Sequence, residues 1–237
     1  MSLLTIVQRA VKQVKVITSD PTTVIGNNDP DIQQAQELLF EVGESLKINY
    51  NWQQLVRQAT FTTSNGTTSY ALSTVVSDGD LDSFIGDCMY DTTSDREVRI
   101  VGVNNYQNLV STVNSSAGID KTIAQYEDSL HIYPTPTSTD TISLFYKSTQ
   151  WITSSGGTGQ DNWLADTDTS RFPEYLLQLG LVALLRREFG LPYAEQQNVF
   201  IGRAEAEAEK NRIKQTLYQQ PYNNIPVANV PDTGFGS

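Results

Sequence analysis

The sequence predicts an α+β fold: a helical bundle formed by N- and C-terminal helices, with an inserted antiparallel β-sandwich or partial barrel. Apolar residues recur at three- and four-residue spacing toward both ends of the 237-residue chain, which is the pattern of helices with one buried face. In the middle, short runs of β-branched and aromatic residues alternate with turn-forming residues, which is typical of antiparallel strands.

These patterns divide the chain into four parts. Residues 1–59 and 171–217 form the predicted helical core, and residues 60–150 form the predicted β domain. Residues 151–170 are rich in Ser, Thr, Gly and Asp and are expected to be a flexible loop. Residues 218–237 are expected to be an extended C-terminal arm, either a free end or a segment that orders on a partner.

Three helices are predicted before the β domain. The first follows Ser2, a favourable N-cap residue, and buries one apolar stripe. The second begins near Asp29 or Asp31, acids that suit the positive end of a helix dipole, and it ends near Lys47. A short third helical stretch is expected over residues 52–59.

The β domain opens with a predicted hairpin. Segments 61–63 and 70–72 flank the turn 64–67, which contains Asn-Gly, a strong hairpin signal between β-forming residues. Further strands are predicted over residues 83–90, 97–103, 123–126, 129–133 and 141–148, and the ambiguous segment 104–113 fits a short helix between strands.

Two more helices are predicted after the loop. The first begins at Pro173, has almost no polar face and should therefore be buried until Gly190 stops it. The second, over about residues 193–217, is long and polar. The arm beyond it carries Asp232 as its only charged side chain at pH 7.

The composition argues against several classes of function. The net charge is −11, and residues 60–150 carry eleven acidic against four basic side chains, whereas nucleic-acid readers need a basic surface. No signal peptide or membrane span is expected, so a soluble intracellular protein with no membrane partner is predicted. With one cysteine, Cys88, and one histidine, His131, a zinc site cannot be assembled.

No catalytic, cofactor or metal site is predicted, and the chain is expected not to be an enzyme. His131 alternates with apolar neighbours in a strand, so a structural role is favoured over a general base. Cys88 is expected to be a small buried residue. The acidic run 76–82 begins like a calcium loop but has Ser83 and Met89 where glycine and glutamate are required. An exposed acidic turn is the favoured interpretation.

The order of the elements and several motifs together resemble one protein family. The motifs are Trp52-Gln53-Gln54-Leu55, Phe61-Thr62-Thr63, Tyr70-Ala71-Leu72, His131-Ile132-Tyr133-Pro134-Thr135-Pro136 and Thr141-Ile142-Ser143-Leu144-Phe145-Tyr146-Lys147-Ser148. Over most of residues 30–217 the chain looks like the head-to-tail adaptor, or head-completion (tail accessory), proteins of tailed, podovirus-type phages. Ser73 stands where that family often has a proline after the first hairpin.

This resemblance implies a structural virion protein. Such adaptors form a ring, a dodecamer, beneath the portal, with helices around a central channel and C-terminal segments that reach onto the portal. The implied partners are the portal protein, a tail or nozzle protein, further copies of the chain, and double-stranded DNA that passes without sequence recognition. The implied location is the neck of the virion, after assembly in the host cytoplasm.

Two sets of residues are candidates for this role. Aromatic residues dominate binding hot spots, and the candidate portal anchors on the arm are Tyr218, Tyr222 and Phe235. Negative charge on a channel wall would keep DNA from adhering, and the candidate lumen acids are Glu205, Glu207 and Glu209.

Two other functions stay open at this point. The first is a β-rich tail component that binds a receptor or glycan, with Trp151 and Trp163 lining a sugar site, although aromatic packing also explains both residues. The second, less favoured, is a cell-wall hydrolase that uses two mid-chain carboxylates such as Asp78 and Asp80.

Overall fold

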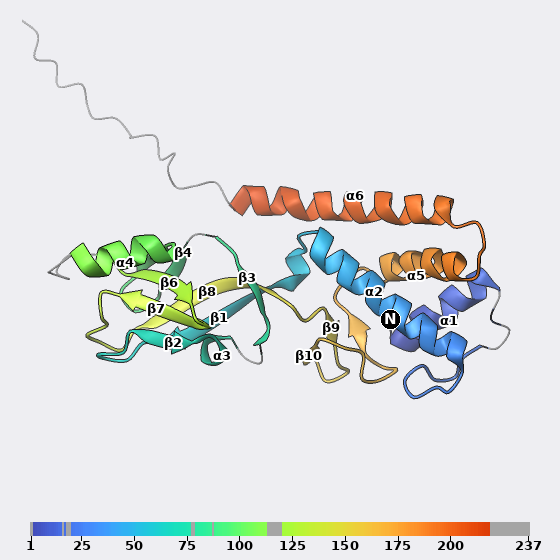
Figure 1. Ribbon diagram of the computed structural model, residues 1–237, viewed down its shortest axis with the longest axis horizontal. Coiled ribbons are helices and arrows are strands. Elements are labelled where there is room, and N and C mark those ends of the chain that lie inside the picture. Colours follow the sequence, from blue (N-terminus) through green and yellow to red (C-terminus); the bar gives the residue numbers. More distant parts are fainter. Residues whose placement is uncertain are drawn as a thin grey trace, which may run out of the picture.

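Two structural units lie end to end along the longest axis of the computed structural model (Figure 1). It describes residues 2–15, 17, 20–76, 79–86, 88–112 and 120–218; for residues 88, 112 and 211–218 it describes the backbone only. One unit contains helices from both ends of the chain, and the other contains a curled β-sheet. The predicted α+β class, with a β insertion between terminal helices, is confirmed.

The helical unit brings the two ends of the chain together. α5 packs against three other helices of the unit. These four helices are α1 (Leu3–Val14), α2 (Pro30–Asn49), α5 (Glu174–Glu188) and α6 (Ala194–Tyr218). Leucines of α5 share one apolar core with the buried rings of Trp52, Trp151 and Phe172, so the predicted burial of the leucine-rich helix is confirmed.

Local side-chain hydrogen bonds set the helix starts. The Ser2 hydroxyl accepts a hydrogen bond from the backbone N–H of Thr5 at 3.4 Å, and the Asp29 carboxylate accepts one from the N–H of Asp31 at 3.0 Å. Each bond satisfies a donor that a helix leaves unpaired in its first turn. The predicted N-cap Ser2 is thus confirmed, and Asp29 is the N-cap of α2, where the second helix is expected to begin.

Two glycines allow α2 to lie very close to its neighbours. A Cβ atom at Gly43 would lie 2.1 Å from the ring of Trp151, and one at Gly180 of α5 would lie 2.5 Å from Val42. Both positions exclude any side chain, because real carbon atoms do not approach so closely. The core of the helical unit is therefore packed around these two glycines.

The β unit is an eight-stranded sheet with the strand order β1-β8-β4-β5-β6-β7-β2, and β3 pairs with β8 outside this path. The sheet curls into a half-barrel around an apolar core. Its elements are β1 (Val56–Thr62), β2 (Ser69–Ala71), α3 (Leu72–Val75), β3 (Leu81–Phe84), β4 (Cys88–Asp91), β5 (Arg96–Ile100), α4 (Val103–Thr112), β6 (Thr122–Tyr126), β7 (Ser129–Tyr133) and β8 (Thr141–Ser148).

The sheet is mixed rather than wholly antiparallel, which corrects one detail of the prediction. β5 and β6 pair in parallel, with Arg99 opposite Thr122. A parallel pair needs a crossover connection, and α4 lies in that connection. The short helix that the sequence allows over 104–113 is confirmed as α4, and it is the reason that these two strands run the same way.

The predicted hairpin around Asn65-Gly66 is wrong. β1 pairs with β8, and β2 pairs with β7, so the two flanking strands lie at opposite ends of the strand order. Curling brings these ends near each other, with the rings of Phe61 and Tyr70 5.3 Å apart. The turn is held by a distant residue, since the Gly66 N–H donates to the carbonyl of Pro136 at 2.9 Å.

Two other predicted elements differ from the structure. Residues 52–59 form only one 3-10 turn, η1 (Gln53–Leu55), because pairing with β8 begins at Val56, which lies opposite Lys147. The predicted strand 83–90 is two strands, β3 and β4, which both pair with β8.

Residues 151–170 are not an irregular loop throughout. They contain three short strands, β9 (Ile152–Thr153), β10 (Gly159–Gln160) and β11 (Thr169–Ser170), which form a separate small sheet. Asp168 accepts hydrogen bonds from the N–H groups of Leu164 and Ala165, both at 2.8 Å. Such local bonds order a segment whose polar composition indicates a loop.

Candidate functional site

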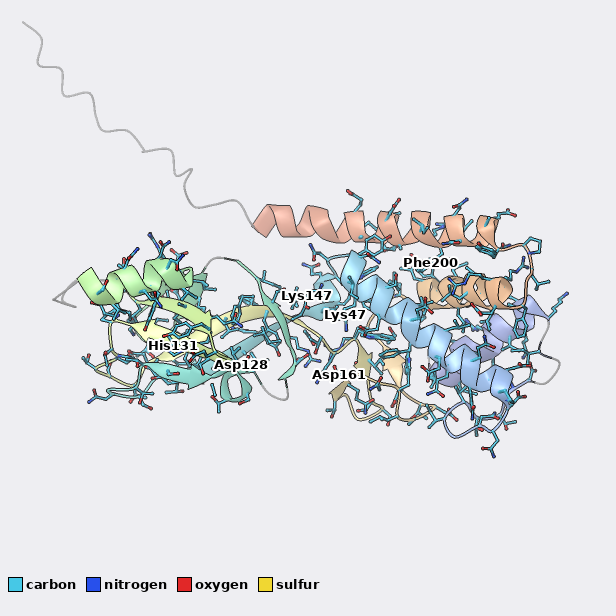
Figure 2. All side chains as sticks on the ribbon, in the orientation of Figure 1. Lys47, Asp128, His131, Lys147, Asp161 and Phe200 are labelled. Atoms are coloured by element: carbon cyan, nitrogen blue, oxygen red, sulfur yellow. The ribbon has the colours of Figure 1, made fainter. Side chains whose placement is uncertain are left out.

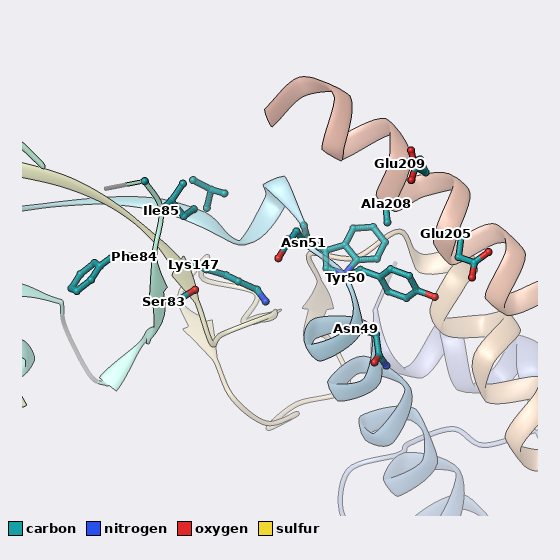
Figure 3. Close-up of a pocket in the computed structure, with 13 residues that line it drawn as sticks. Asn49, Tyr50, Asn51, Ser83, Phe84, Ile85, Lys147, Glu205, Ala208 and Glu209 are labelled. Atoms are coloured by element: carbon teal, nitrogen blue, oxygen red, sulfur yellow. The ribbon is translucent and has the colours of Figure 1, made fainter. Parts of the chain in front are cut away.

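A cleft of about 960 Å³ lies where the helical and β units meet, and we call it the interunit cleft. One side is formed by Glu205 and Glu209 of α6, and the other by Ser83 and Lys147 of the sheet, with Tyr50 between them (Figure 3). The cleft therefore joins four segments that are far apart in the sequence.

Lys147 connects the sheet to the helical unit at the floor of this cleft. Its Nζ atom donates a hydrogen bond to the backbone carbonyl of Lys47 at 3.0 Å and lies 3.3 Å from the carboxylate of Asp82 (Figure 2). The Lys47 carbonyl is in the last turn of α2, where helix carbonyls lack partners and the helix dipole is negative. A cation from the β unit thus caps a helix of the other unit.

Asp80 stabilises the junction by hydrogen bonds on the face of the strands opposite to Lys147. Its carboxylate accepts hydrogen bonds from Arg57 of β1 at 3.0 Å and from the N–H of Gln150, just beyond β8, at 3.2 Å. The Tyr146 hydroxyl also donates to it, at 3.1 Å. Burial first, and then the charge of Asp80, raise the pKa of Tyr146.

The expected exposed acidic turn at 76–82 is corrected at Asp80, whose side chain is only 3% exposed, whereas Asp82 is 41% exposed. Asp78, the other carboxylate considered for a hydrolase, lies outside the described residues. Asp80 is bound on several sides by protein donors, so its environment is that of a structural acid.

A second buried acid group lies inside the β unit. Lys121 Nζ is 2.5 Å from the carboxylate of Asp91 and 2.6 Å from that of Asp140. Burial alone would raise the pKa of Asp91, but hydrogen bonds from Lys121 and Ser94 lower it to about 2. The lysine bridges both carboxylates and offsets one of their two negative charges, so the three residues form a structural ion network.

The single histidine is packed between tyrosines. The His131 ring stacks on Tyr126 with 3.6 Å between ring centroids, and Tyr106 of α4 meets its edge. Figure 2 shows His131 within the β unit. Its Nε2 atom is buried and has no hydrogen-bond partner among the described residues. His131 is half-buried, and its packing between tyrosines fits the structural role that the sequence favours.

The three candidate lumen acids do not lie together. Glu205 and Glu209 are one helical turn apart and both line the interunit cleft, whereas Glu207 points to another side of α6. Glu207 forms an ion pair with Lys210 at 2.7 Å. Burial first, and then a hydrogen bond with Glu207, raise the pKa of Tyr175 to about 12.

The remaining candidates divide between described and undescribed parts of the chain. Tyr218 is the last residue of α6, and only its backbone is described; Tyr222 and Phe235 lie outside the described residues. Trp151 is fully buried and Trp163 is 5% exposed. Neither indole can therefore line a sugar site, and the packing interpretation of both residues is correct.

α6 presents a largely uncovered surface. It runs along α5 (Figure 1) and contacts it through a narrow side that includes Phe200 and Ala204. A different side carries an outer stripe, Glu195, Val199 and Arg203, spaced one turn apart and exposed throughout.

The outer face of the sheet is covered only in part. α4 packs on β6 and β7, while β4 and β8 carry the exposed rings of Tyr90 and Phe145, which are 45% and 51% exposed. We call this uncovered part the open half-face. The sequence carries a signal for it, because residues 141–148 have apolar side chains on both faces of the strand.

Two further kinds of site are missing from the part of the chain that the structure describes. No group of three or more His, Cys, Asp or Glu side chains there is arranged to hold a metal ion. None of the helices described above combines the length and hydrophobicity needed to cross a membrane. What the described surface does offer is the interunit cleft, the exposed side of α6 and the open half-face of the sheet.

Comparison with known proteins identifies the family. A search of curated proteins found no significant match. The family model of the SU10 adaptor protein matches residues 1–228, which includes both units, the connecting strands and all of α6. This is a family of phage adaptors, in agreement with the resemblance carried by the sequence motifs. The chain therefore belongs to the SU10 adaptor protein family.

Proposed function

We propose that this protein forms a ring in the phage neck, joins the portal to the tail and surrounds the channel through which DNA passes. The observation that carries the proposal is the uncovered α6, a 25-residue helix that packs on its own chain along one narrow side. A helix of this length spans roughly 37 Å. Its exposed sides are the kind of surface that a partner covers in an assembly.

Self-association into a closed ring supports this role. A cyclic ring is built from heterologous contacts, in which two different surfaces of each copy meet. The chain has two such surfaces on different units, one on α6 and one on the sheet. The dodecameric number follows from the family resemblance.

The arm after α6 is proposed to bind the portal. Residues 219–237 contain no basic side chain and one acid, Asp232, together with Tyr222 and Phe235. Such a segment can order on a partner surface, where its aromatic residues would insert into pockets. The tail or nozzle protein is proposed to bind the other side of the ring.

DNA passage is proposed to depend on charge rather than on recognition. The net charge of −11, repeated around a ring, disfavours adhesion of DNA to the wall. Glu205 and Glu209 are proposed to face the lumen, since they are exposed side by side on α6. The site of action is proposed to be the virion neck, after assembly in the host cytoplasm.

Light scattering on a sizing column tests the proposal. We expect the protein to elute with the portal of its source phage as a complex whose mass adds a ring of copies. Deletion of residues 218–237 should abolish this complex and leave the helical content unchanged by circular dichroism. A full-length chain that stays monomeric and ignores the portal would refute the adaptor role.

A further inference from the structure

We propose that the open half-face of the sheet is the docking site for the outer stripe of α6 from a second copy of this chain. The inference rests on the proposed ring and names the two surfaces that meet in it. Each surface is exposed on its own copy, and they lie on different units, as a heterologous contact requires.

The coverage of the sheet indicates that a helix is missing from it. A sheet face with apolar side chains is normally buried by a packed layer. On β6 and β7 this layer is α4 of the same chain, and the inner face is buried in the half-barrel core. On β4 and β8 the rings of Tyr90 and Phe145 have no such cover from the described part of the chain. A helix from another copy would complete the layer that α4 begins.

The outer stripe of α6 has the shape for this position. Val199, which is 45% exposed, lies at its centre, and residues one turn before and after it are on the same side of the helix. α6 packs into the core of the helical unit through a different side, which includes Phe200 and Ala204. The stripe can therefore enter a contact with a second copy without disturbing the helical unit.

Charge supports the match and sets its direction. On α6, Val199 lies between an acid, Glu195, and a base, Arg203. On the sheet, Glu97 and Arg99 are two residues apart and both exposed on β5, with Glu97 opposite the exposed ring of Tyr90 and Arg99 opposite Cys88. Docking in one direction places Glu195 near Arg99 and Arg203 near Glu97, whereas the reverse direction places like charges together.

Disulfide trapping tests the contact directly. Two full-length chains are prepared in a Cys88→Ser background, one with Phe145→Cys and the other with Val199→Cys, and are mixed and oxidised under conditions where light scattering shows the ring, alone or on the portal. We expect a crosslinked dimer between the two variants. The matched control is Ile201→Cys, because Ile201 is similarly exposed, at 38%, but lies on another side of α6 and should not crosslink.

A charge exchange tests the direction of docking. Arg99→Glu should weaken assembly about two- to fivefold, the range for an exposed ion pair, and Glu195→Arg in the same chain should restore it. The same Glu195→Arg change alone should weaken assembly to a similar extent.

The outcomes separate the two proposals. A ring that forms without the crosslink between positions 145 and 199, or that crosslinks equally through position 201, overturns this interface and leaves the adaptor role standing. Absence of any ring, both in the free protein and with the portal, overturns both.

Discussion

The helical unit and the β unit are stabilised in different ways. The helical unit has one continuous apolar core with three tryptophans, whereas the β unit has a smaller apolar cluster. Three of the four buried carboxylates among the described residues, Asp80, Asp91 and Asp140, lie in the β unit. A curled sheet closes around little apolar volume, and hydrogen-bonded ions hold its strand ends in place.

The largest loss of stability is expected for a substitution in the apolar core of the helical unit. Trp151 is fully buried and stacks on Phe172 with 5.5 Å between ring centroids. Trp151→Ala should lower the free energy of unfolding by about 4 kcal/mol, because it leaves a large cavity. Urea denaturation followed by circular dichroism measures the change. Leu164→Ala, at a 66% exposed position, is the control and should change it by less than about 0.5 kcal/mol. Equal effects would contradict the assigned core.

The second-largest loss of stability is expected at Asp80, the buried acid of the β unit. Asp80→Asn should cost about 3 kcal/mol, because it removes the charge that Arg57 and the neighbouring donors require. Asp82→Asn is a matched control, since Asp82 is 41% exposed and an exposed ion pair contributes about 0.5 kcal/mol. If the two variants unfold at the same urea concentration, Asp80 does not stabilise the junction.

Two glycine substitutions in the helical unit test the close packing of α2 against α5. Gly180→Ala should destabilise the protein by about 2 kcal/mol, because its Cβ would lie 2.5 Å from Val42 and overpacking strains the core. Gly202→Ala on α6 meets no atom within 4 Å and should instead stabilise the chain by about 0.5–1 kcal/mol. The two variants should shift the melting temperature in opposite directions. Shifts in the same direction would argue against the close crossing of α2 and α5.

As the pH falls, the β unit should unfold before the helical unit. The pKa of Asp91 is lowered to about 2 in the fold, against about 3.9 in an unfolded chain. Its contribution is therefore present above about pH 4 and is lost as the pH falls toward about 2. All three tryptophans lie in the helical unit, so their fluorescence should change after the β signal in circular dichroism. Asp91→Asn should reduce that separation; simultaneous loss in the wild type would contradict it.

The smallest effect is expected where α5 meets α6. The raised pKa of Tyr175, about 12, depends partly on its hydrogen bond with Glu207. Glu207→Gln should move this pKa back toward the ordinary tyrosine value, as measured by ultraviolet titration. Glu209→Gln should leave it unchanged, and an equal shift in both variants would show that general charge, rather than this bond, is responsible.

Sequence patterns predicted the helices well and the strand pairing poorly, for a physical reason. The start of α1 at Ser2 and of α2 at Asp29 depends on hydrogen bonds between residues two or three apart. The partner of β1 is β8, far along the chain, and a local Asn-Gly signal contains no information about that distant strand. The order within 151–170 likewise depends on specific bonds to Asp168 that its composition does not show.

The candidate site was predictable in the same uneven way. The acids on α6 were visible in the sequence, and the helical period alone separates Glu207 from Glu205 and Glu209. The exposed ring of Phe145 follows from strand alternation once the buried face is known. The interunit cleft could not be predicted, because it exists only where α2, β8 and α6 converge.

The junction between the units makes the β unit an exchangeable module. The chain enters it through β1 and leaves through β8, and these strands are antiparallel neighbours with Val56 opposite Lys147. A short turn that joins those two positions would close the helical unit without stretching it. Insertions with adjacent ends can be lost, replaced or lengthened while the host fold persists. The β unit of such an adaptor can therefore diversify independently of the helices that build its core.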